Sequence, residues 1–393
     1  MTIKVTLDRE AVPISREVFA ALFEQSVVHD YKPIQRALTS GVMPYRELVR
    51  MARQAEIPYP LFFAPLDVVN EQLRMKTEAL MVGFNKKTEF AMNSRSRVRI
   101  NEVELIVKDL LRKQEYLKTD KALPRNAVVN SLQRPGASVQ EDAGKLMRLL
   151  DLGPTDLRSA KNKGEALALL IEKLEAQYVL VAQSAKNYMP QQMPKGARFS
   201  GMTIKDNKVP YIFIASGDEG EKYEPAGRRV FTLALLAVLV ARGTFATVTY
   251  KDHTSDGTTF REWEITAEIL MPAADFKGAD LGTLDAVREV SDEFKVTPSA
   301  VVTRARRLSL LGSEEADRYL DELRVAYESG GNPPRRSPRG LKALRKYNGV
   351  ECSRRMLALY DSQAISRGDF CRVMFSNKFR GAQSINDYRA LVS

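Results

Sequence analysis

The residue types best suited to metal or nucleophilic chemistry are scarce in this chain. It has two histidines, His29 and His253, and two cysteines, Cys352 and Cys371. The histidines stand in unrelated contexts with no cysteine pair near either, which argues against a metal site built mainly from His and Cys. We interpret His253 as a surface-loop residue. Two cysteines are too few for a disulfide framework in 393 residues, and we expect reduced, partly buried thiols.

Carboxylates offer a second kind of chemistry, because they are the ligands that Mg²⁺ prefers. The candidates for a hydrolytic or nuclease centre of this kind are Asp218, Glu219, Glu221, Glu262 and Glu264. Their spacing matches no recognised site, and a solvated loop explains the first three more simply. A hydrolase with a non-standard acidic metal site therefore stands as the alternative function.

Basic residues are concentrated at one end of the chain. Residues 332–393 hold 13 Lys and Arg against 4 Asp and Glu, which is +9 of the net charge of +11. Such a block predicts contact with phosphates or an acidic partner. The candidate nucleic-acid contacts are Arg335, Arg336, Arg339, Lys342, Arg345 and Lys346 in this tail, with Arg304, Arg306 and Arg307 upstream. A shorter basic stretch, Asn93–Arg99, is interpreted as a solvated loop.

An apolar helix is predicted after Pro225, and its sequence resembles a catalytic helix. Phe231-Thr-Leu-Ala234 matches the start of the Phe-Thr-Leu-Ala-His-Glu-x-x-His segment of the ImmA/IrrE family of zinc metallopeptidases. The resemblance continues in Ala197–Ala215, in Glu262–Pro272, which ends in Leu-Met-Pro, and in Leu284–Leu311. It implies an α+β, zincin-like fold and a relationship to enzymes that cleave a repressor.

The residues that the family uses for catalysis are replaced in this chain. Leu235, Leu236 and Leu239 stand where the family has its first His, its Glu and its second His. Counting back from the proline of Met-Pro, the third ligand falls on Arg261; Glu262 is adjacent but makes a poor zinc site without imidazoles. Leucine can neither bind Zn²⁺ nor activate its water. We therefore expect no catalytic residues, no metal and no cofactor, and we interpret this segment as a core helix.

The elements around this helix are predicted from periodicity and end signals. Residues 1–135 are expected to be mainly helical, with clear helices at 44–55 and 102–117. Helices are expected at 140–152 and 163–176, and strands at 178–182, 197–204, 209–215 and 246–250. Thr283–Leu311 is expected to form a helix-turn-helix-like pair, for which packing is at least as good an interpretation as groove binding. The tail is expected to fold as helices at 341–347, 351–360 and 367–375.

These elements suggest four regions: a helical N-terminal region at 1–136, the zincin-like domain at 137–275, the helix-turn-helix-like region at 276–330 and a basic helical extension at 331–393. At 44% hydrophobic and 28% charged residues, the composition is typical of a globular protein. With no signal peptide or membrane helix expected, we predict a cytoplasmic chain. The resemblance implies an inactive family member that binds a repressor, a toxin or DNA, in a mobile-element, phage-defence or toxin–antitoxin setting. If DNA is bound, the charge of the tail makes it the better candidate for phosphate contacts.

Overall fold

The computed structural model describes residues 2–8, 10–24, 26–84, 91–92, 102–192, 199–216, 224–249, 261–330 and 338–392. The chain divides into two compact units. Unit 1 comprises Met1–Gly83 with Val98–Asp109, and unit 2 comprises Phe84–Arg97 with Leu110–Ser393. Residues 110–136 therefore group with the residues that follow them, whereas the sequence suggested a boundary at 136. The four regions inferred from the sequence remain predictions.

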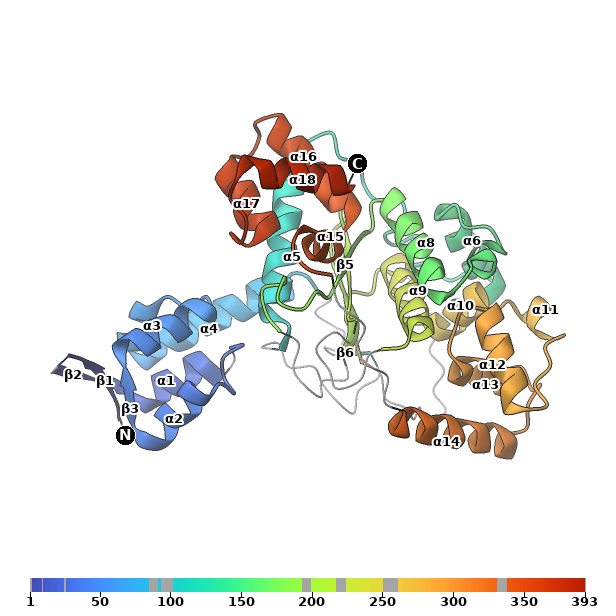
Figure 1. Ribbon diagram of the computed structural model, residues 1–393, viewed down its shortest axis with the longest axis horizontal. Helices are drawn as coiled ribbons and strands as arrows, with labels where there is room; N and C mark the ends of the chain where they lie inside the picture. Colours follow the sequence, from blue (N-terminus) through green and yellow to red (C-terminus); the bar gives the residue numbers. More distant parts are fainter. Residues whose placement is uncertain are drawn as a thin grey trace. The chain divides into compact units, whose positions relative to one another are not determined.

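Unit 1 combines a small sheet with helices (Figure 1). Its elements are β1 (Thr2–Leu7), β2 (Glu10–Ser15), α1 (Arg16–Glu24), α2 (Lys32–Ser40), β3 (Val42–Pro44), α3 (Tyr45–Gln54), the 3₁₀ helix η1 (Tyr59–Phe63) and α4 (Leu66–Met81). The sheet order is β2-β1-β3, with β1 antiparallel to β2 and parallel to β3. The described part of residues 1–135 is mainly helical, as expected, but the sequence reasoning missed this small sheet.

The alternation of Ile3 and Val5 with Thr2 and Lys4 explains why β1 forms. Ile3 and Val5 are buried, and their neighbours on the chain are exposed, as a half-buried strand requires. The core beneath contains aromatic rings: Phe23 lies 4.9 Å from Phe19 and 4.8 Å from Phe62 between ring centroids. Unit 1 thus has a hydrophobic core of its own.

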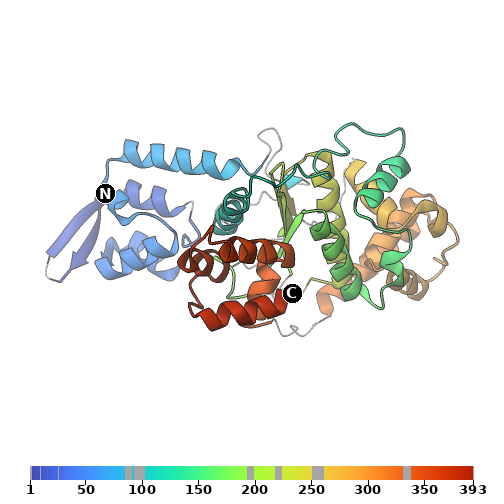
Figure 2. The ribbon, with the colours of Figure 1, turned by 90° about the horizontal axis from the view of Figure 1, so that it is seen from above.

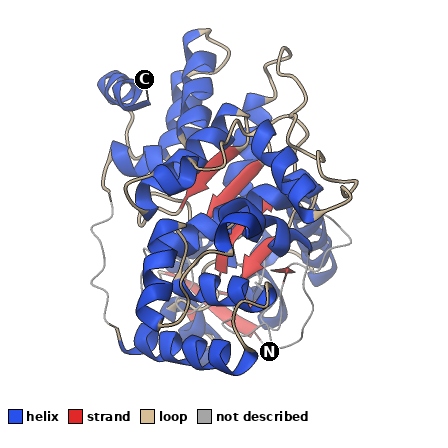
Figure 3. Ribbon diagram, turned by 90° about the vertical axis from the view of Figure 1, so that its right-hand side faces the viewer, coloured by secondary structure: helices blue, strands red, loops and turns tan. Residues whose placement is uncertain are grey.

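Unit 2 contains the second sheet and most of the helices. Its strands are β4 (Ala91–Met92), β5 (Leu180–Gln183), β6 (Phe199–Ile204), β7 (Tyr211–Ile214) and β8 (Thr247–Thr249). The helices of unit 2 that precede β8 in the chain are α6 (Val139–Leu149), α7 (Asp156–Ser159), α8 (Lys163–Ala176) and α9 (Ala226–Arg242). Helix α5 (Glu104–Leu117) begins in unit 1 and ends in unit 2. Figure 3 shows the strands of the protein in red and its helices in blue.

The later helices of unit 2 follow the sheet in the chain. They are α10 (Arg261–Leu270), α11 (Ala273–Phe276), α12 (Leu284–Glu293), α13 (Pro298–Arg307), α14 (Ser313–Ser329), α15 (Leu341–Asn348), α16 (Val350–Asp361), α17 (Arg367–Phe375) and α18 (Ala382–Val392). Predicted helix starts are confirmed where the hydroxyls of Thr283, Thr297 and Ser366 accept hydrogen bonds from the amides of Ala286, Ala300 and Asp369. The sequence reasoning missed α14 and α18.

The five-stranded sheet of unit 2 has the order β4-β8-β6-β7-β5. Strand β6 runs antiparallel to both of its neighbours, β7 and β8, whereas β5 is parallel to β7 and β4 is parallel to β8. The four strands predicted in this region are confirmed. Helix α9 packs against β6 and β7, with α8 and α10 beside it, and Figure 2 shows α8 and α9 side by side. The fold is α+β, as expected.

Both cysteine thiols are free and buried, which confirms the interpretation of Cys352 and Cys371. Burial raises the pKa of the Cys371 thiol, so it stays protonated at neutral pH. Within the described residues, no helix has the length and apolarity that a bilayer crossing requires.

Candidate functional site

The helix that resembles a zinc helix lies in the centre of the unit 2 core. Every residue of α9 from Arg229 to Ala241 is buried. Leu235, Leu236 and Leu239 are 1%, 0% and 0% exposed. Helix α9 ends at Gly243, whose φ of 71° lies in the left-handed region that glycine tolerates best. The three leucines therefore lie inside packed protein, as expected of a core helix.

Leu236 is packed tightly against the sheet, at a position in β6 that only glycine fits. A Cβ at Gly201 would stand 2.6 Å from the Phe213 carbonyl oxygen and 2.7 Å from Cδ1 of Leu236. The leucine side chain thus occupies the space that a side chain of β6 would otherwise fill. Burial of each leucine contributes about 1.5–3 kcal/mol, so the position of the family's general base contributes to the core here.

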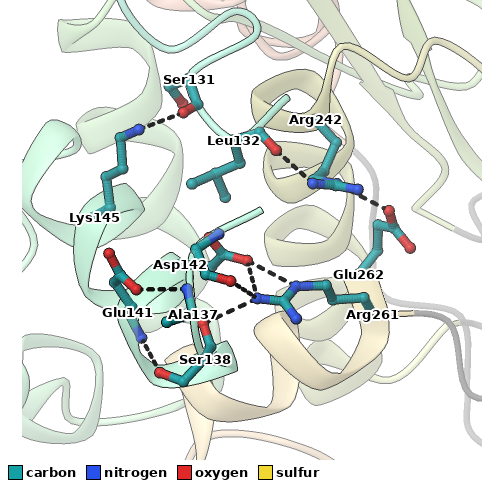
Figure 4. A network of polar contacts seen from close by, with 11 residues as sticks. Ser131, Leu132, Ala137, Ser138, Glu141, Asp142, Lys145, Arg242, Arg261 and Glu262 are labelled. Carbon is teal, nitrogen blue, oxygen red and sulfur yellow. Dashed lines mark hydrogen bonds and ion pairs between the residues drawn. The ribbon is translucent and has the colours of Figure 1, made fainter. Parts of the chain in front are cut away.

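The third-ligand position, Arg261, forms a structural ion pair (Figure 4). Its guanidinium lies 2.8 Å from Oδ2 of Asp142, a buried carboxylate in the first turn of α6. Nη2 of Arg261 also donates to the carbonyl oxygens of Gly136 and Ser138, at 2.9 and 3.1 Å. These bonds connect the start of α10 to the start of α6. We call this set the Arg261 clamp.

A second arginine lies beside the clamp. Arg242, at the end of α9, donates to Oε1 of Glu262 at 3.2 Å and to the Leu132 carbonyl at 2.5 Å. Figure 4 shows Arg242 and Arg261 in one polar network. The sequence suggested Glu262 as a possible zinc ligand next to the third-ligand position. In the structure its carboxylate forms an ion pair with Arg242.

The other candidate metal ligands are not brought together in the described residues. Glu264 lies 2.8 Å from Arg307 and 3.5 Å from Arg304. Asp218, Glu219, Glu221 and His253 lie outside the described residues, as does Asn93–Arg99. In the described part of the chain, no three His, Cys, Asp or Glu side chains are grouped closely enough to hold a metal ion.

The helix-turn-helix-like pair is packed into unit 2, and no residue of its second helix, α13, is exposed. Helix α13 packs between α12 and α14. The turn before α13 also lies on α9, because a Cβ at Gly227 would stand 2.4 Å from the Val296 carbonyl oxygen. Of the two interpretations of this segment, packing agrees with the structure.

The three arginines of α13 that were predicted to contact nucleic acid all pair with carboxylates. Arg304 is 4% exposed, forms an ion pair with Glu268 and donates to the Met271 carbonyl at 3.2 Å. Arg306 lies 2.8 Å from Asp317, and Arg307 lies 2.8 Å from Glu264. The prediction for Arg304 is withdrawn because a buried, paired guanidinium cannot reach a phosphate. Arg306 and Arg307 each have a carboxylate partner in the structure.

The described tail residues that were predicted to contact nucleic acid lie at α15. Arg339 precedes the helix and is exposed; Lys342 and Arg345 are exposed on it, and Lys346 is half-buried. Positions 342, 345 and 346 share one helix face by their spacing, and α15 itself contains no acidic residue. We call these four residues the α15 basic face. Arg335 and Arg336 lie outside the described residues.

The opposite side of α15 is fixed by a buried polar network that the sequence did not suggest. The Asn348 side chain accepts from Lys113 Nζ at 2.7 Å and donates to the Met374 carbonyl at 2.9 Å and to the Tyr388 hydroxyl at 3.1 Å. The Tyr388 hydroxyl in turn lies 2.7 Å from that of Ser353. Burial raises the pKa of Tyr388, which therefore stays protonated. The network connects the end of α15 to α5, α16, α17 and α18, while Lys342 and Arg345 remain exposed.

Comparison of the chain with protein-family models, with curated proteins and with solved structures finds no match in any of the three.

Proposed function

We propose that this protein acts by binding a partner and that the site resembling a peptidase centre is catalytically inactive. The observation that carries the proposal is the full burial of Leu235, Leu236 and Leu239. A catalytic zinc site needs three protein ligands and an open position for water, in a cavity that substrate can enter. Here the corresponding positions are occupied by packed methyl groups.

The charge at the third-ligand position supports the same proposal. A guanidinium stands where a carboxylate would complete the zinc site, and it is held by Asp142 and two carbonyl oxygens. A fixed positive charge disfavours a divalent cation nearby. The order of the strand pair β6–β7, the core helix α9 and a helix α10 followed by Met271-Pro272 supports a degenerate member of the ImmA/IrrE family.

The partner that this relationship suggests is a protein, either a repressor or a toxin. DNA is a further ligand, bound through the α15 basic face. In the described residues, Arg339, Lys342 and Arg345 form no ion pair, in contrast to the arginines of α13. Unpaired, exposed cations on a rigid helix are suited to phosphate contacts. A mobile-element, phage-defence or toxin–antitoxin context is part of the proposal.

The test for a protein partner is co-purification of the natural chain from its host, followed by mass spectrometry. A small helix-turn-helix repressor in the complex, encoded by a neighbouring gene, supports a regulatory role. A toxic enzyme in that position supports neutralisation. Recovery of neither protein nor nucleic acid would contradict binding as the function.

The test for DNA uses Lys342→Gln, Arg345→Gln and Lys346→Gln together. The matched control replaces the exposed Arg288 and Arg318 and the half-buried Arg324, which each pair with a carboxylate three residues earlier. We expect the slope of log K against log salt for duplex DNA to fall by about 0.9 for each phosphate that the variant no longer neutralises. Equally weakened binding in variant and control would remove the α15 basic face from the proposal.

The alternative function, a hydrolase with an acidic metal site, gains no support from the described residues. Glu262 and Glu264, its only described candidates, are paired with Arg242 and Arg307. Each carboxylate would have to leave an arginine before it could bind a metal ion.

A further inference from the structure

Helix α3 of unit 1 carries an arginine stripe that neither the sequence reasoning nor the proposed function uses. Arg46, Arg50 and Arg53 are spaced four and three residues apart, so they share one face of the helix. All three are exposed. The opposite face, with Leu48, Met51 and Ala52, is buried in the unit 1 core. The stripe is therefore held in a fixed orientation toward solvent.

The surroundings of the stripe do little to neutralise it. Helix α3 packs against β1, β3 and η1. Those three elements contain one lysine, Lys4, and no acidic residue. On α3 itself the only acid is Glu47, which lies 3.2 Å from Arg50 in an exposed pair that stabilises weakly. Glu56, beyond the helix, pairs with Lys108 at 3.7 Å. The four elements together carry three net positive charges.

Aromatic rings lie next to this positive surface. Tyr45, the first residue of α3, contacts Tyr59 edge-to-face, with ring centroids 6.1 Å apart. Tyr59 and Phe63 of η1 are 43% and 44% exposed. Desolvation and the hydrogen bond with Tyr59 raise the pKa of Tyr45, and the positive charge of Arg53 acts against this rise. Exposed rings beside exposed arginines are the combination that stacks bases while holding phosphates.

We propose that the α3 arginine stripe and the exposed rings of η1 form a binding surface for single-stranded nucleic acid. The arginines contact the phosphates, and Tyr59 and Phe63 stack on bases. A single strand is favoured over a duplex because base faces are available for stacking only when they are not already stacked in a helix. This surface belongs to unit 1 and is separate from the α15 basic face, which belongs to unit 2.

The first test measures binding of the full-length chain to a fluorescent oligothymidine of about 16 nucleotides, a length within the range that one binding module covers. The variant carries Arg46→Gln, Arg50→Gln and Arg53→Gln. The control carries Arg288→Gln, Arg318→Gln and Arg324→Gln, which removes the same charge. We expect at least tenfold weaker binding for the variant only, and a salt slope lower by about 2, since each single-strand phosphate contact contributes about 0.7. Equal affinities for variant and control overturn the proposal.

The second test separates stacking from charge. We expect Tyr59→Ala to weaken binding roughly fivefold or more and Tyr59→Phe to leave it unchanged, because stacking needs the ring and not the hydroxyl. Phe63→Ser provides a second ring deletion should Tyr59→Ala fail to fold. A strand substituted with 5-iodouracil should crosslink to the peptide that contains Tyr59. Crosslinks confined to residues 338–392, or a duplex that competes as well as the single strand, would contradict the assignment.

Discussion

Glu175 shows how a single buried side chain joins two helices of unit 2. It lies at the end of α8, and its carboxylate accepts hydrogen bonds from the amides of Val350 and Glu351 at 3.2 and 3.3 Å, in the first turn of α16. Gly349 passes so close that a Cβ there would stand 2.4 Å from Oε1 of Glu175. Burial raises the pKa of Glu175 to about 7, although these amides act against it.

This raised pKa predicts that the protein becomes less stable as pH rises. The folded chain holds a proton on Glu175 that the unfolded chain has released, so the free energy of unfolding falls between about pH 4.5 and 7. The full contribution is on the order of 3 kcal/mol. Glu175→Gln keeps an acceptor for the two amides and removes the titration. We expect urea denaturation at pH 5 and pH 8 to show a smaller loss of stability in the variant.

Glu224 is a second source of pH-dependent stability, because burial raises its pKa to about 7 as well. Some loss toward pH 8 should therefore persist in Glu175→Gln. Identical pH slopes in the variant and the natural chain would show that Glu175 does not titrate in this range. The sequence could not have revealed this residue, since its partners lie about 175 positions further along the chain.

At the scale of elements, the Arg261 clamp couples α10 to α6 and to the segment before it. Asp142 accepts from Arg261 and also from the Gly136 amide at 2.8 Å. Arg261→Ala would leave the buried Asp142 carboxylate without its cation. We expect a loss of roughly 3 kcal/mol in the free energy of unfolding, the lower end of the range for breaking a buried pair. Urea denaturation at neutral pH provides the measurement.

The control for this prediction is Arg288→Ala, which removes an exposed arginine paired with Asp285. Its expected cost is below about 1 kcal/mol. A comparable cost for the two variants would mean that the clamp contributes no more than a surface pair. The arginine would then be unexplained at this position.

The sequence predicted helices correctly where the hydrophobic periodicity and the capping residues indicated the same element. Thr283 and Thr297 cap α12 and α13, and such cap residues are a local signal in the sequence. The β1–β2 hairpin was missed although Ile3 and Val5 alternate with polar residues, because the longer helical patterns that follow outweighed this short one. The burial of Arg304 could not be predicted from the sequence, because its partners are distant in the chain. Glu268 lies on α10, and Met271 directly follows that helix.

At the scale of the whole molecule, the two units have separate cores and different basic surfaces. In unit 2 the core is centred on α9, and the residues that would have made a metal site are part of it. The sequence located this helix, because its apolar run is a local signal. Two contacts could not be predicted from the sequence because they join distant segments. Leu236 packs on Gly201, 35 residues earlier, and Arg261 pairs with Asp142, 119 residues earlier. Both contacts hold Leu236 and Arg261 in place within the packed part of unit 2.

The most direct test of this account is the zinc content of the natural chain, purified from cells grown with added zinc and passed through gel filtration. Leucines inside the core and an arginine at the third position cannot bind the ion, so we predict far less than one zinc per chain and no EDTA-sensitive cleavage of a co-purified protein. One zinc per chain that survives gel filtration, together with cleavage that EDTA abolishes, would contradict the account.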